Sequence, residues 1–436
     1  MSNTPFHMQG GASSSGRHIV TALDIGSTKI TCFIGKPMSG RTRWTEDGQR
    51  VQMRIMGVGY QPASGVRAGA IVDMEAAEGA IRAAVDQAER MARVTIDSVV
   101  ASLSCGRIGG ESFEVESSLA GDQVTDKDVQ SLLNAGYEYA QMKGRSSLHV
   151  LPMDFSLDGN RAIEDPRGLY GKTLRANIHV VSTDSGAIRN LKACIERCHL
   201  VVEKFVAVPY VSGLSVLQPD ELRLGVINLD MGGERTNASV FHRGKLVFLT
   251  SVALGGHHIT TDIARGLSTS IAHAERLKTF HGSALVSSQD ERELIAVPAI
   301  GDNDETEVNR IPKSMLTGII QPRLEETFEM IRDRLEENGF GSGGDSGIVL
   351  SGGACQLTGA RELASRIFSQ QVRKGQPQYV SGLPEAARGP AFSACAGLLL
   401  HSQVPEFHFD QKQFSRFHRA RGGYLARVGS WLRENF

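Results

Sequence analysis

Two stretches of this chain repeat one pattern, in which an apolar strand-like run enters a short Asp-x-Gly turn and a second run follows. The first stretch has runs over 19–23 and 29–34 around the turn Asp24-Ile25-Gly26-Ser27-Thr28. In the second, the run over 224–229 ends at Asp230-Met231-Gly232-Gly233. Apolar runs around a glycine turn predict β-hairpins. Their recurrence predicts a chain built from two similar halves.

A third glycine turn, Ser351-Gly352-Gly353-Ala354, closes the buried run over 347–350. Glycine lets a row of backbone N–H groups approach an anion, and a carboxylate at a strand end can hold Mg²⁺ through water. A single Asp-x-Gly turn is more often a plain β-turn. Three glycine turns in order, two of them opening repeated hairpins, indicate that two facing hairpins clamp a triphosphate between two domains.

The near-zero net charge argues against partners that bind through a strong electrostatic field of the whole protein. Lys and Arg number 47 against 48 Asp and Glu, for a net charge of -1, so we expect no nucleic-acid partner. No stretch has the roughly 18 consecutive apolar residues of a spanning helix, and residues 1–17 lack the apolar core of a signal peptide. The sequence therefore predicts a protein that stays in the cytoplasm.

Strand-like and helix-like patterns alternate through most of the chain, which predicts an α/β fold. Helices are expected over 260–280 and over 313–338, the second interrupted at Pro322. The expected segments, in chain order, are a disordered tail (1–17), a first domain in two parts (18–98 and 182–222) around an inserted α+β subdomain (99–181), a second domain with a helical subdomain that caps the nucleotide (223–401), a linker (402–421) and an amphipathic helix (422–436).

The last segment carries one apolar stripe at helical spacing with arginines beside it. The residues of the stripe are Tyr424, Leu425, Val428, Trp431, Leu432 and Phe436, and the arginines beside it are Arg427 and Arg433. Aromatic and basic residues in this pattern are typical of a helix that lies in the headgroup plane of an anionic membrane. A terminal helix packed on the protein's own core is the alternative. The polar linker over 402–421 favours the membrane.

The order and spacing of the three turns resemble the actin, Hsp70 and sugar-kinase superfamily, and the detailed resemblance is to FtsA, a family of actin-like cell-division proteins of bacteria. The stretches that carry it are Leu148-His149-Val150-Leu151-Pro152, Gly168-Leu169-Tyr170-Gly171, Asp262-Ile263-Ala264-Arg265-Gly266-Leu267-Ser268-Thr269, Ala274-Glu275-Arg276-Leu277-Lys278 and Ile320-Gln321-Pro322-Arg323-Leu324-Glu325-Glu326. The resemblance implies an actin-like (ribonuclease H-like) two-domain fold, with the family's inserted subdomain over 99–181.

The same resemblance implies that the turns bind ATP and Mg²⁺. Asp24 and Asp230 would hold Mg²⁺ through water, and Glu275 and Lys278 would flank the ribose and base. A solvated helix pair is the alternative for the last two. The implied contacts to the phosphates are Gly26, Ser27, Thr28, Lys29, Gly232 and Gly233, and those to the adenosine side are Gly352, Gly353 and Ala354.

The chain departs from the family's pattern at two places. Glu234-Arg235-Thr236-Asn237 follows the second turn, where the family usually continues with Gly-Thr-Thr or Gly-Thr-Met. Arg235 could bind the γ-phosphate, whereas Glu234 would repel it. Val208 is apolar where active relatives carry a Gln or Glu that orients the attacking water. We therefore expect at most a weak ATPase, in which ATP acts as a binding switch that closes the cleft.

The function implied by the resemblance is that of a polymerising adaptor. It would tether the FtsZ ring to the cytoplasmic face of the inner membrane at the division site, as a peripheral membrane protein, and help recruit later division proteins. Its partners would be the FtsZ C-terminal tail, further copies of itself and anionic lipids. Arg323 and Glu326 are the candidate contact for the tail, with an intramolecular helix pair as the alternative. An actin-fold ATPase or small-molecule kinase with substantial turnover is the alternative function.

Overall fold

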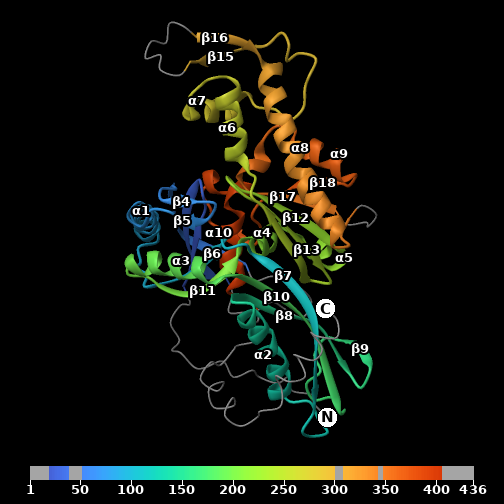
Figure 1. The fold of residues 1–436 in the computed structure, drawn as a ribbon. Helices are drawn as coiled ribbons and strands as arrows, with labels where there is room; N and C mark the ends of the chain where they lie inside the picture. The colour runs from blue at the N-terminus through green and yellow to red at the C-terminus, as the bar shows by residue number, and fades with distance from the viewer. Residues whose placement is uncertain (1–18, 39–51, 300–307, 342–346, 405–436) are drawn as a thin grey trace.

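The structure, a computed structural model, describes residues 19–38, 52–299, 308–341 and 347–404. The predicted tail over 1–17, the linker from residue 405 onward and the predicted membrane helix over 422–436 lie outside the described residues. Two sheets of the same design form the body of the molecule, and a third sheet extends from its lower end in Figure 1.

The first sheet contains the predicted hairpin. Its first three strands form an antiparallel meander, and two more strands join the β1 edge in parallel. A short strand pairs in parallel with the opposite edge. The spatial order is β11 (Val201–Ala207), β6 (Ser98–Leu103), β1 (Val20–Ile25), β2 (Lys29–Pro37), β3 (Met53–Pro62) and β19 (Val380–Ser381).

The second sheet repeats this plan. Three consecutive strands form an antiparallel meander. A fourth strand pairs in parallel with the first of these three, and a fifth strand pairs in parallel with the fourth. The order is β14 (Lys245–Val252), β13 (Thr236–His242), β12 (Val226–Met231), β17 (Gly347–Ser351) and β18 (Val372–Lys374). The two similar halves predicted from the repeated hairpin are therefore confirmed.

Two helices lie between the sheets and belong to the core of both halves. Every residue of α4 (Val208–Val216) and α10 (Ser393–His401) is buried, in agreement with helices that are apolar on all sides. They cross closely at Gly397, where a Cβ atom would lie 1.8 Å from the Val211 carbonyl oxygen. The core of the first half thus continues across this helix pair onto the second sheet, and the second half has a further core of its own.

The remaining helices cover the outer faces of the sheets and build the upper part of Figure 1. On the first half, α1 packs on β3 and α3 packs on β11. Further helices and a two-stranded ribbon make up the rest of the second half. Short 3₁₀ turns and a small hairpin lie in the connecting segments. The elements are α1 (Met74–Ala92), α3 (Ser185–Arg197), α5 (Pro219–Leu224), α6 (Gly256–Gly266), α7 (Ile271–His281), β15 (Leu294–Pro298), β16 (Val308–Pro312), α8 (Lys313–Glu337), α9 (Ala360–Phe368), the 3₁₀ turns η1 (Gly353–Gln356), η2 (Glu385–Ala387) and η3 (Pro390–Phe392), and the hairpin β4 (Val66–Arg67) and β5 (Ala70–Ile71).

Two helix predictions were wrong in detail. The helix expected over 260–280 is two helices, because Ser270 caps α7 by accepting a hydrogen bond from the His273 N–H at 3.2 Å. The interruption expected at Pro322 is absent, and α8 continues through it. Buried side chains on both sides of the proline, including Ile320 and Leu324, hold the helix against the rest of the second half.

The inserted subdomain is an antiparallel sheet covered by one helix. Its strands lie in the order β7 (Gly109–Ser118), β10 (Thr173–Asp184), β8 (Arg145–Leu157) and β9 (Asn160–Ile163), and α2 (Asp126–Met142) packs on β8 and β10. It has a hydrophobic core of its own, which includes Leu132, Leu133 and Phe155. The predicted α+β insertion is therefore confirmed as a separate packing unit.

Two predicted domain boundaries need correction. The insertion was expected from residue 99, but β6 (Ser98–Leu103) pairs with β1 and β11 in the first sheet, so the insertion begins after Leu103. The second domain was expected to run to 401, but β19 pairs with β3, and α10 packs on β1, β2 and β6. The chain thus returns to the first half before the described part ends.

In the described ranges, no helix is both long and apolar enough to cross a membrane.

The helix crossing at Gly397 yields a stability prediction. Gly397→Ala should lower the melting temperature by several degrees, because the added methyl group meets backbone and α4 and α10 must separate. Gly79→Ala in α1 is the matched control: its Cβ would meet open space, and the variant should gain up to about 1 kcal/mol of stability from helix propensity. Equal melting temperatures for the two variants would contradict the close crossing.

Candidate functional site

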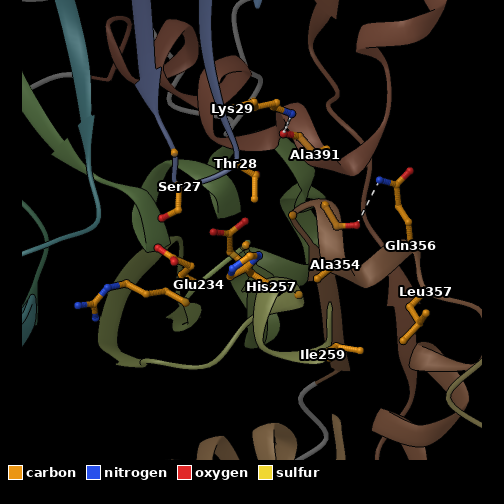
Figure 2. Close-up of a pocket in the computed structure, with 18 of the residues that line it drawn as sticks. Ser27, Thr28, Lys29, Glu234, His257, Ile259, Ala354, Gln356, Leu357 and Ala391 are labelled. Atoms are coloured by element: carbon orange, nitrogen blue, oxygen red, sulfur yellow. Dashed lines mark hydrogen bonds between the residues drawn. The ribbon is translucent and has the colours of Figure 1, made fainter. Parts of the chain in front are cut away.

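A cavity of about 1100 Å³ lies between the two halves, where the turns after β1 and β12 face each other (Figure 2). Ligand pockets typically measure roughly 300–1,000 Å³, so this one can enclose a cofactor-sized molecule. Its wall contains all the residues predicted to contact the nucleotide or its Mg²⁺: Asp24, Gly26, Ser27, Thr28, Lys29, Asp230, Gly232, Gly233, Arg235, Glu275, Lys278, Gly352, Gly353 and Ala354. The fold brings them together, and their ligand stays a prediction.

The two hairpin turns have the same internal hydrogen bond. The Gly26 N–H donates to the Lys29 carbonyl at 3.1 Å, and the Gly232 N–H donates to the Arg235 carbonyl at 2.8 Å. The turns also touch each other, since a Cβ on Gly233 would lie 2.3 Å from Cγ2 of Thr28. A side chain at Gly233 would therefore push the two halves apart.

Two carboxylates stand at the strand ends beside these turns. Asp24 is 8% exposed and Asp230 is 6% exposed, and both line the cavity. Burial raises the pKa of Asp24, while its hydrogen bond from Ser102 acts in the opposite direction. Burial raises the pKa of Asp230 to about 6, and the charge of Asp24 adds to this effect. Ionised together, the two groups are costly without a cation.

Sequence reasoning missed the side chains that support these carboxylates. Ser102 Oγ donates to Asp24 Oδ1 at 2.7 Å. Asn237 Nδ2 donates to Asp230 Oδ2 at 3.2 Å, and Ser351 Oγ lies 3.5 Å from Asp230 Oδ1. The register of the sheet provides the missing signal, because Asn237 and Ser351 are the direct strand partners of Asp230.

The donor set fits a divalent cation. Mg²⁺ prefers oxygen ligands, keeps several of its waters and needs only one or two carboxylates when phosphate supplies the rest. Asp24 and Asp230 match this requirement at the mouth of the two turns. Over the described ranges, no cluster of three or more His, Cys, Asp or Glu side chains is arranged to hold a metal ion. A cation between these carboxylates would therefore complete its shell from a ligand and from water.

The side chain of Lys29 is turned toward the η3 side of the cavity (Figure 2). Its ammonium donates a hydrogen bond to the Ala391 carbonyl and lies 3.5 Å from the centroid of the Phe392 ring. Burial lowers the pKa of Lys29 to about 8, against the opposing attraction of Asp24. The lysine therefore connects the first turn to η3.

Glu275 and Lys278 form both a helix pair and a part of the cavity wall. Lys278 Nζ donates to Glu275 Oε2 at 2.7 Å, to Thr260 Oγ1 at 2.8 Å and to the Gly256 carbonyl at 2.9 Å. The helix pair left open by the sequence is thus present, and it joins α7 to the beginning of α6. Whether these side chains contact a ribose stays a prediction.

Glu234 and Arg235 reach across the cleft to the first half. The Glu234 carboxylate accepts a hydrogen bond from the Ala68 N–H, and Arg235 Nε donates to the Ala68 carbonyl at 3.1 Å. Ala68 lies at the tip of the β4–β5 hairpin with a φ of 46°. Both side chains also line the cavity, as does the buried Val208. The two residues that depart from the family's pattern therefore bridge the halves.

The candidate partner residues Arg323 and Glu326 lie on α8. Arg323 pairs with Glu326 and with Asp262, with Arg323 Nη2 donating to Asp262 Oδ1 at 3.2 Å. The intramolecular helix pair that was the alternative is thus present, and a role in partner binding stays a prediction. The stripe from Tyr424 to Phe436 lies outside the described residues.

Two protein-family models match the chain. One, described as "Cell division protein FtsA", matches residues 227–397, and the other, described as "SHS2 domain inserted in FTSA", matches residues 106–182. The second match covers the segment from β7 to β10 and begins after β6. The inserted subdomain is therefore similar to a domain type found at this position in other proteins.

Several curated proteins are similar to the chain over nearly its full length. Cell division protein FtsA of Agrobacterium fabrum is 44% identical over 427 residues, which is 97% of this chain and 96% of that protein. The protein of the same name from Rhizobium meliloti is 45% identical over 424 residues, with the same coverage of both chains. That of Escherichia coli K12 is 30% identical over 430 residues, covering 97% of this chain and 99% of its own.

Solved structures share the fold at low identity. A chain of the PilM-PilN type IV pilus biogenesis complex has a TM-score of 0.63 and 16% identity, covering 89% of this chain and 100% of its own. MreB5 of Spiroplasma citri bound to ADP has a TM-score of 0.50 and 13% identity, covering 92% of this chain and 99% of its own. The predicted actin-like fold with its insertion is confirmed.

The buried carboxylates yield a prediction for the protein without ligand. At pH 8, Asp230→Asn should raise the free energy of unfolding by about 1–3 kcal/mol, because it removes a buried charge whose pKa is about 6. Folded Asp230 binds its proton more tightly than the unfolded group, so the difference should grow as pH rises through about 6 and shrink toward pH 4.

Urea unfolding at pH 8 and at pH 4 measures the difference in the free energy of unfolding between the Asp230→Asn protein and the unchanged protein. Asp86→Asn, which changes an exposed carboxylate on α1, is the control and should change little at either pH. An Asp230→Asn protein that is equally or less stable than the unchanged protein at pH 8 would contradict the burial cost.

Proposed function

This chain belongs to the FtsA family of cell division proteins, and we propose that its cleft binds ATP with Mg²⁺. The observation that carries the proposal is the pair of facing glycine turns, each beside a buried carboxylate, in one cavity of about 1100 Å³. A further argument is that MreB5, which has the same fold, is bound to ADP.

The residues of the cavity have distinct roles in this proposal. Ser27, Thr28, Gly233 and Lys29 bind the phosphates. Gly26 and Gly232, whose N–H groups close the two turns, let the phosphates approach the backbone closely. Asp24 and Asp230 hold Mg²⁺ through water, and the ion neutralises phosphate charge when bound. Glu275 and Lys278 flank the ribose and base, opposite Gly352, Gly353 and Ala354.

The site is suited to binding more than to turnover. Val208, which lines the cavity, has no group that can orient a water, and Pro209 follows it. Arg235 and Glu234 are engaged with Ala68 across the cleft. We therefore propose at most a weak ATPase. An actin-fold ATPase or kinase with substantial turnover is the competing function, and steady-state turnover above about 1 per second would favour it.

The wider proposal is a peripheral adaptor on the cytoplasmic face of the inner membrane at the division site. It forms polymers of itself, binds the C-terminal tail of FtsZ near Arg323 and Glu326 on α8, and helps recruit later division proteins. The family assignment and the basic, aromatic stripe from Tyr424 to Phe436 support this proposal. Avidity within a polymer would strengthen the binding of each single helix to anionic lipid.

Calorimetric titration with Mg·ATP tests the cleft. Asp230→Asn should reduce affinity at least tenfold, because a neutral amide neither attracts Mg²⁺ nor balances its charge. In the unchanged protein, affinity should fall as pH drops below about 6, since Asp230 becomes protonated. Asp86→Asn is again the control. Equal affinity of the Asp230→Asn and Asp86→Asn proteins would defeat the assignment.

Co-sedimentation with anionic liposomes tests the membrane segment. Trp431→Glu should abolish sedimentation, because it places a charge where the helix enters the acyl boundary. Ser430→Glu is the matched control, since helical spacing puts Ser430 on the face opposite the stripe. Neither variant should change the melting temperature. A drop of several degrees for Trp431→Glu alone would mean that the segment packs on the protein's own core, contrary to the proposal.

A further inference from the structure

The inserted subdomain, taken here as β7 to β10, is attached to three different parts of the body. Its chain entry and exit join the first half, one histidine contacts the helix pair between the halves, and a lysine of the second half contacts β8. A rigid insertion attached in this way is sensitive to any rotation of the halves against each other.

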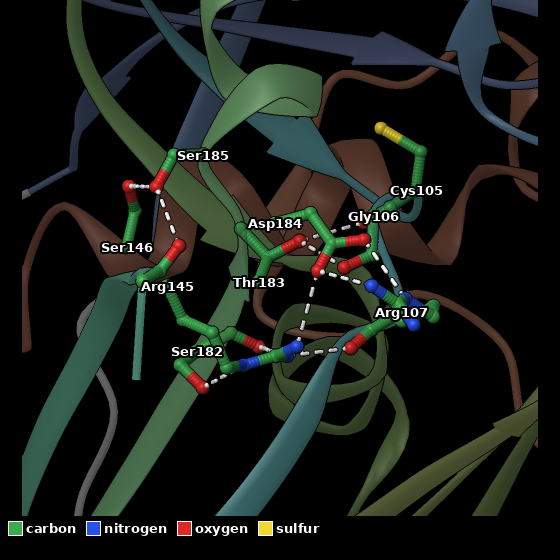
Figure 3. Close-up of polar contacts among 10 residues, drawn as sticks. Cys105, Gly106, Arg107, Arg145, Ser146, Ser182, Thr183, Asp184 and Ser185 are labelled. Carbon is green, nitrogen blue, oxygen red and sulfur yellow. Dashed lines mark hydrogen bonds and ion pairs between the residues drawn. The ribbon is translucent and has the colours of Figure 1, made fainter. Parts of the chain in front are cut away.

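The first attachment is the neck, where the chain enters and leaves the insertion (Figure 3). Thr183 Oγ1 donates to the carbonyl oxygens of Cys105 at 3.0 Å and Gly106 at 2.9 Å, and the Asp184 N–H donates to Gly106 at 2.8 Å. Gly106 has a φ of 77°, and a Cβ there would lie 2.3 Å from Thr183 Oγ1. The entering and leaving segments are therefore in close contact.

Arg145 at the beginning of β8 strengthens the neck. Its guanidinium donates to the Arg107 carbonyl at 2.6 Å, to Ser182 Oγ at 2.8 Å and to the Ser182 carbonyl at 2.9 Å, and it pairs with Asp184 at 3.2 Å. Figure 3 shows this guanidinium between the two segments. With two covalent connections and this network, the neck is the strongest of the three attachments.

The neck is also continuous with the cleft. Strand β6 carries Ser102, whose hydroxyl donates to Asp24. Ser104, just after the strand, lines the cavity, and Gly106 lies two residues further along the chain. The insertion is therefore joined directly to the strand that supports one of the two cleft carboxylates.

The second attachment is His149 on β8. Its Nε2 accepts a hydrogen bond from the Ala207 N–H at 3.1 Å, and Ala207 directly precedes α4, whose first residue Val208 lines the cavity. The imidazole ring also packs edge-on against Tyr210 at 5.1 Å and His401 at 5.6 Å between centroids. This attachment lies on the helix pair about which the halves meet.

The third attachment comes from the second half. Lys245 at the beginning of β14 donates from Nζ to the carbonyl oxygens of Met153 at 2.7 Å and Pro152 at 3.2 Å in β8. The Lys245 side chain is half-buried, and this burial lowers the pKa of its ammonium. Strand β14 also packs on β7 and β8, so these two hydrogen bonds are part of a wider contact between the second half and the insertion.

We propose that the inserted subdomain moves with the first half, and that the Lys245 contact to β8 is made only when the cleft is closed. The structure has the closed arrangement, since Glu234 and Arg235 hold Ala68 across the cleft. A rotation of the second half in either direction displaces Nζ from the two carbonyl oxygens, and hydrogen bonds tolerate little displacement. The orientation of the insertion then depends on nucleotide. That last dependence rests on the proposed function.

Lysine footprinting on the full chain tests the contact without nucleotide. The rate at which an acylating reagent modifies Lys245 is measured by mass spectrometry, with exposed Lys192 as the internal reference. Glu234→Ala with Arg235→Ala removes the bridge to Ala68 and should raise Lys245 modification several-fold. Arg361→Ala with Glu362→Ala, an exposed ion pair on α9, is the control and should leave it unchanged. No increase in the bridge variant overturns the proposal.

The second arm uses reciprocity between coupled sites. If closure and the Lys245 contact are coupled, Lys245→Met must weaken Mg·ATP binding several-fold, although Lys245 is not part of the cavity wall. Lys192→Met is the control. In the unchanged protein, Mg·ATP should also slow the modification of Lys245.

The outcomes separate the two proposals. Normal Mg·ATP affinity in the Lys245→Met protein, together with unchanged Lys245 modification in the Glu234→Ala, Arg235→Ala protein, overturns the coupling and leaves the proposed function standing. A protein that binds no Mg·ATP contradicts the proposed function, while the bridge variant still decides whether the Lys245 contact follows cleft closure.

Discussion

The central constraint on this molecule is the burial of two carboxylates, Asp24 and Asp230, at one interface. A buried carboxylate is stable only where hydrogen-bond donors and a counter-charge are supplied. Both halves supply donors from neighbouring strands. Ser102 donates to Asp24, and Asn237 donates to Asp230, with Ser351 Oγ 3.5 Å from the same carboxylate. The repeated sheet order thus has a chemical purpose, since it presents two equivalent carboxylates to one cavity.

The second constraint is that the two halves share their core. Helices α4 and α10 are apolar on all sides and cross at Gly397, so they belong to neither half alone. A core of this kind does not deform continuously, because close packing leaves few intermediate arrangements. The close crossing of these helices therefore limits relative motion of the halves to movements that keep this contact packed. Every group attached to them, including His149 of the insertion, is displaced with them.

Binding and turnover place different demands on such a cleft. Turnover needs a positioned water and rapid opening, whereas a switch needs a stable closed state. Val208 provides no hydrogen bond for a water, and the bridge from Glu234 and Arg235 to Ala68 stabilises closure. Val208, Glu234 and Arg235, which depart from the pattern of active relatives, thus all favour a stable closed cleft over turnover.

The sequence alone determined the repeated hairpins and the glycine turns, because hairpin register and turn geometry are encoded by residues that lie close together in the chain. The resemblance to the family, and not local geometry, supplied Glu275 and Lys278. Tertiary structure decided the features that depend on distant partners. Packing of Ile320 and Leu324 carries α8 through Pro322, and strand pairing returns β19 to the first half. Glu234 and Arg235 form hydrogen bonds with the backbone of Ala68. A backbone partner cannot be predicted from the pattern of side chains. Local sequence specifies local geometry, whereas the choice among distant partners is made only when the core closes around them.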